Sequence, residues 1–311
     1  MSHGVPTAFL FPGQGAQAVG LAARAYGCSA AARRVIDEMD HSLEIPLSKV
    51  VMGGPPEALV MSNNAQPALL CASIALLREM EEQFGTDAPR PVFLAGHSLG
   101  EYSALVAAGS IELTTGLQLV RQRGELMQEA CEASPSGLAA VLGLSLAEAR
   151  RACQGTGAEV ANANSAEQIV IGGSIENLAL ARAQAEAAGA KRVITLQVAG
   201  AFHTQIMRSA QEGMDSILSE IEFLEPSVPV IANTTALPMT SGSHIRDELG
   251  NQICGCVYWQ QSVEYMVNSG VGRFVEFGPG KVLTGLVRRI APDVQAIAVT
   301  DLDDLAALGV T

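Results

Sequence analysis

Short apolar runs alternate with longer helical stretches over the first 130 residues of the chain. The run "TAFLF" at 7–11 ends in a glycine-rich turn, and "RPVFLAG" at 90–96 is followed by a helical stretch from Leu99. Short apolar runs bounded by turns are typical of buried strands, and their alternation with helices is typical of a parallel sheet. This part of the chain therefore predicts an α/β fold class.

Between residues 138 and 200 the pattern changes to shorter units. It predicts, in order, a strand at 139–144, a helix at 145–154, strands at 158–164 and 168–173, a helix at 174–190 and a strand at 191–198. Strand–helix–strand–strand–helix–strand is the ferredoxin-like order. We therefore expect a small ferredoxin-like lobe at 133–202, inserted into a larger lobe formed by 1–132 and 203–311.

The rest of the chain returns to the larger lobe. A helical pattern extends from about 204 to 221, and "VPVIANT" at 228–234 predicts a strand. The segment 272–290 predicts a strand, a Gly-Pro-Gly turn and a helix, and "AIAVT" at 296–300 predicts the last strand.

The composition is that of a globular enzyme. The chain has 311 residues, of which 48% are hydrophobic and 16% charged, and a formal net charge of −13. Such a charge argues against nucleic acid or an anionic membrane surface as the main partner. No run of about 18 apolar residues and no basic leader is visible, so we expect a cytoplasmic protein with no membrane segment.

The six cysteines are scattered along the chain. Cys254 and Cys256 form a lone C-x-C with no second Cys or His pair nearby. We therefore expect reduced packing residues and no metal site.

The sequence "GHSLG" at 96–100 is the strongest sign of chemistry. It follows a predicted strand and precedes a predicted helix, which is the context of a nucleophile elbow. In such an elbow Ser98 is exposed on a sharp turn, and the following backbone N–H groups face a developing oxyanion. The alternative is a glycine-rich turn in which Ser98 merely caps the helix.

A serine nucleophile needs a base, and the chain has five histidines. His3 is terminal, and His41 and His244 lie in polar surroundings. His97 is adjacent to Ser98 in a tight turn, so we expect it to support the elbow. His203, in "AGAFHTQIM", lies where the chain returns from the small lobe and is the predicted base, a purely structural histidine being the alternative.

Arg123 projects from an apolar helix face. On a helix at about 115–132, its neighbours at i±3 and i±4 are Leu119, Val120, Leu126 and Met127. A buried guanidinium requires a partner. That partner is either an internal carboxylate or a carboxylate of the substrate, which arginine binds with two parallel hydrogen bonds.

The segment 13–18 fits the dinucleotide pattern G-x-G-x-x-A, with Asp37 at a suitable distance downstream. Asp37, however, falls within a helical pattern, where a dinucleotide fold needs the end of a second strand. We therefore interpret these glycines as a turn that lines the crevice of Ser98.

Taken together, these stretches resemble the malonyl-CoA:acyl-carrier-protein transacylase family, which includes fatty-acid enzymes and freestanding acyltransferases of polyketide synthases. The motifs occur in family order over nearly the whole chain: "FLFPGQGAQ", "NNAQPALL", "GHSLGEYSAL", "RQRGELMQEA", "GAFHTQIM", "NQICGCVYWQQSVEYM" and "FVEFGPGKVLTGL". The resemblance implies a hydrolase-like parallel-sheet lobe with an inserted ferredoxin-like lobe. It also implies S-malonyltransferase activity with ping-pong kinetics.

By this resemblance, Ser98 is the acylated nucleophile and His203 the general base and acid. Arg123 would bind the free carboxylate of the malonyl group, and the backbone N–H groups of Gln14 and Leu99 would form the oxyanion hole.

Gln252 matches the position whose backbone carbonyl orients the catalytic histidine in place of a triad aspartate. This chain departs from the family beside it, because "CGCVYW" stands where Asn-Pro-Val is common. Phe202 matches an aromatic position associated with malonyl selection, since its ring would crowd an α-methyl group.

The implied partners are malonyl-CoA and an acyl carrier protein, with no bound cofactor or metal. Because carrier proteins and this chain are both acidic, docking would need a local basic patch, with these candidates: Lys191, Arg192, Lys281, Arg288 and Arg289. Three alternatives stay open: a serine thioesterase or esterase, a transacylase for another extender unit such as methylmalonyl, and a non-catalytic docking subunit.

Overall fold

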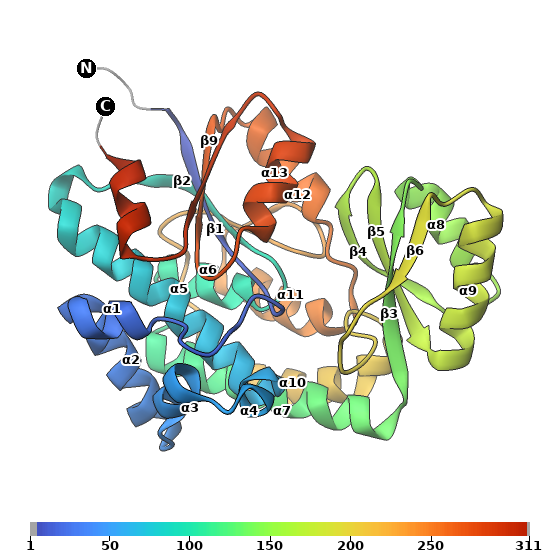
Figure 1. Cartoon of the computed structure of the whole chain (residues 1–311), viewed down its shortest axis with the longest axis horizontal. Helices are drawn as coiled ribbons and strands as arrows, with labels where there is room; N and C mark the ends of the chain where they lie inside the picture. Colours follow the sequence, from blue (N-terminus) through green and yellow to red (C-terminus); the bar gives the residue numbers. More distant parts are fainter. Residues whose placement is uncertain (1–4, 310–311) are drawn as a thin grey trace.

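The computed structural model describes residues 5–309 and contains two β-sheets that lie side by side (Figure 1). The larger sheet has the strand order β10-β9-β1-β2-β7-β8, and only the β7–β8 pair is antiparallel. Its strands are β1 (Thr7–Phe11), β2 (Pro91–Gly96), β7 (Val230–Ile231), β8 (Pro238–Met239), β9 (Arg273–Phe277) and β10 (Gln295–Val299). This arrangement confirms the predicted parallel α/β core.

Helices cover both faces of the larger sheet. Phe9 and Phe11 of β1 face one apolar cluster, and Ala8 and Leu10 face another, because successive side chains of a strand point to opposite faces. The first cluster packs against the helices α1 (Ala23–Cys28), α2 (Ala30–Leu43), α3 (Leu47–Gly53), α4 (Pro56–Val60), α5 (Ser62–Phe84), α6 (Gly100–Ala107), α7 (Leu113–Ala133), α10 (Arg208–Ser219) and α11 (Gly242–Cys254). The second packs against α12 (Trp259–Asn268) and α13 (Val282–Ile290).

The smaller sheet is antiparallel and has the order β4-β5-β3-β6. Its elements are β3 (Ser136–Leu142), α8 (Leu146–Cys153), β4 (Glu159–Ser165), β5 (Gln168–Ser174), α9 (Ile175–Ala187) and β6 (Arg192–Thr195). Both helices pack on one face, where Ala139, Val141 and Ile171 meet Leu178 and Ala181. The predicted ferredoxin-like order is confirmed, while the lobe limits 133–202 stay a prediction.

Some predicted elements are shorter than expected. The strand predicted at 228–234 covers only β7, because beyond it the N–H of Asn233 donates to the Glu101 carboxylate and not to a neighbouring strand. The strand predicted at 191–198 is limited to β6. The helix predicted at 204–221 begins as a 3-10 turn, η2 (Gln205–Met207), which continues into α10. Two further 3-10 segments are η1 (Gly85–Asp87) and η3 (Leu302–Leu308).

Helices α11 and α12 were not predicted from the sequence pattern.

Among the helices of residues 5–309, none combines the length and the apolar character that crossing a membrane requires.

Candidate active site

Ser98 lies on a sharp turn between β2 and α6. Its φ of 52° is in the left-handed region, which a side chain other than glycine rarely adopts. A Cβ on Gly96 would lie 1.9 Å from the backbone of Gly100, and one on Gly100 would lie 2.0 Å from the carbonyl oxygen of Phe11. Both glycines are therefore required for this turn, which has the geometry of a nucleophile elbow.

His203 reaches Ser98 from the segment after β6. Its Nε2 lies 2.7 Å from Ser98 Oγ, and its Nδ1 lies 2.8 Å from the backbone oxygen of Gln252. Because a carbonyl can only accept, Nδ1 carries the proton and Nε2 is free to accept one from the serine. The Gln252 carbonyl thus occupies the place of a triad acid, although the chain reads "CGCVYW" just beyond it.

Burial keeps His203 neutral. Desolvation, followed by the positive charge of Arg123, lowers the pKa of His203 to about 3. An imidazole with such a pKa is unprotonated at neutral pH, which is the form that a general base requires.

Arg123 is fully buried on α7 and lies beneath Ser98. Its Nη1 donates to Gln66 Oε1 at 2.8 Å, and its Nη2 donates to Gln252 Oε1 at 2.9 Å and to Ser98 Oγ at 3.1 Å. Burial lowers the pKa of Arg123, yet guanidinium remains charged in proteins. Among the described residues no carboxylate forms an ion pair with it.

Two backbone N–H groups near Ser98 are free. Within residues 5–309, neither the Gln14 nor the Leu99 amide donates a hydrogen bond. Gln14 lines the cavity of Ser98, and Leu99 precedes the first residue of α6. Free amides beside a nucleophile can stabilise an oxyanion.

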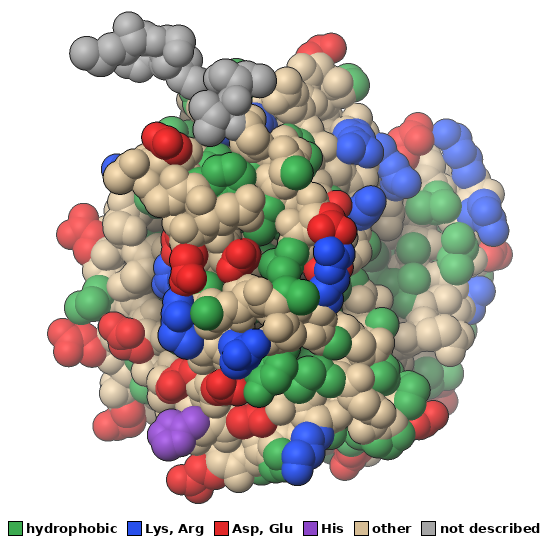
Figure 2. Space-filling model, turned by 60° about the vertical axis from the view of Figure 1, so that its left-hand side comes forward, with side chains coloured by type: hydrophobic (Ala, Val, Ile, Leu, Met, Phe, Trp, Pro, Cys, Tyr) green, Lys and Arg blue, Asp and Glu red, His purple; other side chains and the backbone are tan. Residues whose placement is uncertain are grey.

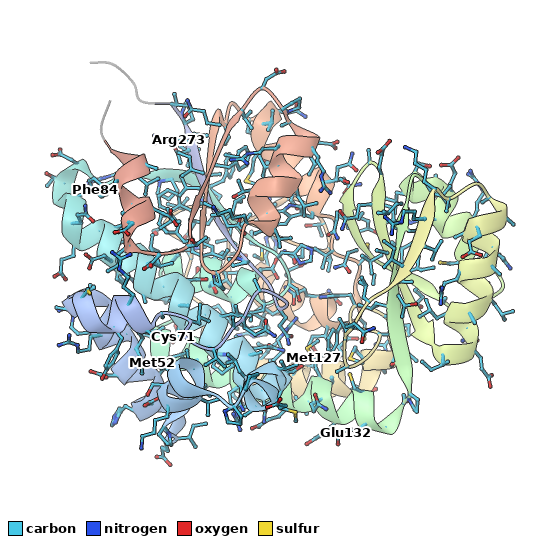
Figure 3. The ribbon with its side chains drawn as sticks, in the orientation of Figure 1. Met52, Cys71, Phe84, Met127, Glu132 and Arg273 are labelled. Atoms are coloured by element: carbon cyan, nitrogen blue, oxygen red, sulfur yellow. The ribbon has the colours of Figure 1, made fainter. Side chains whose placement is uncertain are left out.

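The site opens into a cavity of about 770 Å³, lined by turns and helices around the larger sheet and by β3, β4 and β5 of the smaller sheet. Ser98, His203, Phe202 and Met127 are among its lining residues, and Figure 3 places Met127 at the boundary between the two sheets. The glycine turn at 13–17 also lines it, and Asp37 lies within α2, as expected.

His97 supports the turn from the side. Its Nε2 lies 2.9 Å from Oδ1 of Asn164 on β4, so the elbow is tied to the smaller sheet. His41 and His244 form no part of this site, and His3 lies outside the described residues.

Three polar residues of this network were not predicted. Gln66 bridges Arg123 and Gln14, and the fully buried Glu101 contacts both Asn233 and Gln252. Gln66 is a buried amide in an otherwise apolar helix segment, which is a signal in the sequence. Glu101 and Asn233 carry no such local signal.

The basic candidates are not equivalent. Lys281 and Arg289 line the cavity, and Arg289 donates to Gln168 Oε1 on β5. Lys191 forms an exposed ion pair with Glu167. Arg192 lies on β6, and Leu142 of the intervening strand β3 pairs with both Arg192 and Gln168. Figure 2 shows acidic and basic side chains interleaved on one face, with basic side chains gathered at its upper right.

The cysteines play no part in these contacts. All six are free, and burial raises the pKa of Cys254 to about 11. No group of three His, Cys, Asp or Glu side chains in the described part of the chain is placed to hold a metal ion.

Comparison with known proteins adds to this geometry. The profile of the acyl transferase domain matches residues 8–303. The chain is 41% identical over 299 residues to the malonyl CoA-acyl carrier protein transacylase of Bacillus subtilis, covering 94% of this chain and 93% of the relative.

Two solved structures are closely similar. An acyl carrier protein S-malonyltransferase from Vibrio cholerae has a TM-score of 0.93 at 38% identity, covering 97% of this chain and 99% of that one. A malonyl-transacylase in complex with a type II PKS acyl-carrier protein has a TM-score of 0.92 at 38% identity, covering 97% and 98%. With a matched profile over nearly its whole length, the chain belongs to the acyl transferase domain family.

Proposed function

We propose that this chain transfers a malonyl group from coenzyme A to the phosphopantetheine thiol of an acyl carrier protein. The names of its relatives support this substrate pair. One observation carries the proposal for this chain: a buried guanidinium, paired with no carboxylate of the described residues, lies 3.1 Å from the oxygen of a histidine-activated serine.

In the first half of the cycle, Ser98 Oγ attacks the thioester carbonyl while His203 Nε2 accepts its proton. The Gln14 and Leu99 amides stabilise the oxyanion. When the intermediate collapses, the carbon–sulfur bond breaks and His203 returns the proton to the departing thiolate, so coenzyme A leaves as a thiol.

The second half reverses the first. His203 takes the proton of the phosphopantetheine thiol, whose sulfur attacks the malonyl ester of Ser98. Collapse breaks the ester bond, and His203 protonates Ser98 Oγ. The cycle uses only groups of this chain and two thiols, and it requires neither a metal ion nor a resident cofactor.

Arg123 would bind the carboxylate of the malonyl group. The buried guanidinium donates to three acceptors, and an incoming carboxylate can reach it where one of these acceptors lines the cavity. Of these acceptors only Ser98 lines the cavity. The diacid therefore takes over the Nη2 contact with Ser98, which fixes the acyl ester in one pose and favours the thiol over water by positioning.

Phe202 would exclude bulkier extender units. It is half-buried, precedes His203 and lines the cavity. A phenyl ring there crowds a substituent on the α-carbon, which favours malonyl over methylmalonyl. A serine thioesterase, the second candidate, would share Ser98 and His203 but has no use for a guanidinium beneath the nucleophile.

The partner would dock at the cavity mouth. Lys281 and Arg289 lie there and supply positive charge on an otherwise acidic chain. We also propose a cytoplasmic location, because coenzyme A thioesters are made and consumed there.

Intact-protein mass spectrometry tests the function in one assay. The chain is incubated with malonyl-, methylmalonyl- or acetyl-CoA, and carrier protein is then added. We expect a malonyl adduct that moves to the carrier, no adduct on Ser98→Ala, and a weaker methylmalonyl adduct.

The Arg123→Ala variant is the matched comparison. We expect its malonyl adduct to be lost while its acetyl adduct persists, since acetyl has no carboxylate. Rapid release of free malonate without a thiol acceptor would instead identify a thioesterase.

A further inference from the structure

Glu101 is a buried carboxyl group that the proposed cycle does not use. It lies on the first turn of α6 and is 0% exposed. Its Oε1 accepts from the backbone N–H of Asn233 at 2.7 Å and from Asn233 Nδ2 at 3.0 Å, and its Oε2 accepts from Gln252 Nε2. A buried carboxyl group is costly to desolvate, and these three hydrogen bonds offset part of that cost.

The hydrogen-bond partners favour the carboxylate form. Each is an N–H group that can only donate, so the O–H of a neutral acid would find no acceptor among them. Burial and then the charge of Glu248 raise the pKa of Glu101 well above its ordinary value, although its contacts with Asn233 and Gln252 and the charge of Arg123 act in the opposite direction.

One branch of contacts leads from Glu101 to Arg123. Because a guanidinium only donates, the Gln252 amide must present Oε1 to Arg123 and therefore Nε2 to Glu101 and to the carbonyl of Ser98. Only an acceptor at position 101 is compatible with that orientation. Glu101 thus offsets the charge of Arg123 through the Gln252 side-chain amide that lies between them. The guanidinium itself forms no direct ion pair with Glu101.

A second branch leads to Ser98. Asn233 Oδ1 accepts the N–H of Ser98 at 2.7 Å, and Asn233 Nδ2 donates to the carbonyl of Gly96 at 2.7 Å. These two bonds bracket the turn in which Ser98 adopts a positive φ. Glu101 Oε1 fixes the Asn233 side chain and so supports this strained turn.

We propose that Glu101 is a positioning residue for the nucleophile and for the diacid-binding arginine. Through Gln252 it aligns Arg123 toward the malonyl carboxylate, and through Asn233 it holds the Ser98 turn. This inference rests on the proposed malonyl transfer.

The test is Glu101→Gln, which keeps the shape but supplies one acceptor and one donor. The Asn233 N–H holds the new carbonyl oxygen, so the new NH₂ faces Gln252 Nε2. Turning the Gln252 amide relieves this donor–donor contact but breaks its bonds to Arg123 and to the carbonyl of Ser98. We expect malonyl kcat/KM to fall about 10- to 100-fold, as for the loss of a hydrogen bond to a charged group, and acetyl kcat/KM to change little.

The control is Glu276→Gln, since Glu276 is also 0% exposed and accepts three hydrogen bonds, all from Leu283 and Thr284. We expect the ratio of malonyl kcat/KM to acetyl kcat/KM in this variant to equal that of the unsubstituted protein. Asn233→Ala tests the second branch and should lower both rates by the same factor, whereas unchanged rates would overturn that role.

An unaltered malonyl-to-acetyl ratio in Glu101→Gln, or an equal fall of that ratio in Glu276→Gln, would overturn the proposal. If Glu101→Gln yields no folded protein, Glu101→Asp takes its place, because it keeps the charge but is one methylene shorter. It should still lose more malonyl than acetyl transfer, and equal losses would refute the positioning role. If the protein without any substitution transfers no malonyl group, the proposed function itself is refuted.

Discussion

Burial and the charge of Arg123 together set the environment of His203. Its Nε2 shares Ser98 Oγ with Nη2 of Arg123, so the imidazole and the guanidinium meet at one oxygen. A cation at this distance disfavours a second cation, which adds to the effect of burial on the histidine. The group proposed to select the substrate therefore also keeps the base unprotonated.

This coupling predicts the pH profile of acyl transfer. The rate needs neutral His203, so it falls as the pH drops through the pKa of that residue, which is about 3 and far below the ordinary value. In Arg123→Ala the pKa should rise toward the ordinary value, and the acid limb of acetyl transfer should move to higher pH. Acetyl-CoA is the readout because it does not need the guanidinium.

Arg123→Lys is the control for that shift. It keeps a positive charge beneath Ser98, so its acid limb should stay close to that of the unchanged chain. An identical limb in all three proteins would show that Arg123 does not act on His203.

The individual site residues differ in how far the sequence could reveal them. Ser98, with its flanking glycines, and Arg123, on an apolar helix face, carry local patterns that the structure places in one network. Glu101 and Asn233 do not, because they are 132 residues apart in the chain and meet only in the folded molecule. A buried network that joins distant segments leaves no periodic signal along the chain.

The turn between β2 and α6 depends on two glycines that leave no space for a side chain. We predict that Gly100→Ala lowers the free energy of unfolding by at least about 3 kcal/mol, because the added Cβ would lie 2.0 Å from the carbonyl oxygen of Phe11 and the backbone would have to move. Urea unfolding followed by circular dichroism measures this change.

Gly27→Ala on α1 is the matched variant, since a Cβ there meets no atom within 4 Å. It should be neutral or stabilising by up to about 1 kcal/mol. Similar effects of both substitutions would mean that the Ser98 turn has room for a side chain.

Regular elements were largely predictable, and their ends were not. The alternation of strands and helices gave both sheets, since a strand buried on both faces, such as β1, is a continuous apolar run. The strand at β7 is only two residues long because side chains take over the hydrogen bonds that a longer ladder would make. Where side chains replace the backbone partners of a strand in this way, the end of the strand is set by tertiary contacts and not by local propensity.

The cavity lies between helices and turns of the larger lobe and the strands of the smaller sheet, and its mouth carries positive charge. We predict that the double variant Lys281→Glu with Arg289→Glu raises the KM for the carrier protein about tenfold with little change in kcat. Charges at the rim of an interface act mainly on association, and carrier proteins are acidic. Steady-state kinetics at two salt concentrations measures the effect, which should shrink at high salt.

Lys49→Glu with Arg90→Glu is the control of equal charge change. Both side chains are exposed, and neither lines the cavity. An equal rise in KM for this pair would assign the effect to net charge alone.

The oxygen that orients His203 belongs to the peptide bond of Gln252. In a Ser-His-Asp enzyme, one codon change can erase the corresponding oxygen. Here no codon change can, because every amino acid brings the same carbonyl to that place. Mutational scanning of position 252 would therefore report on the amide side chain and its partners. In every variant, the backbone carbonyl would still fix the tautomer of His203.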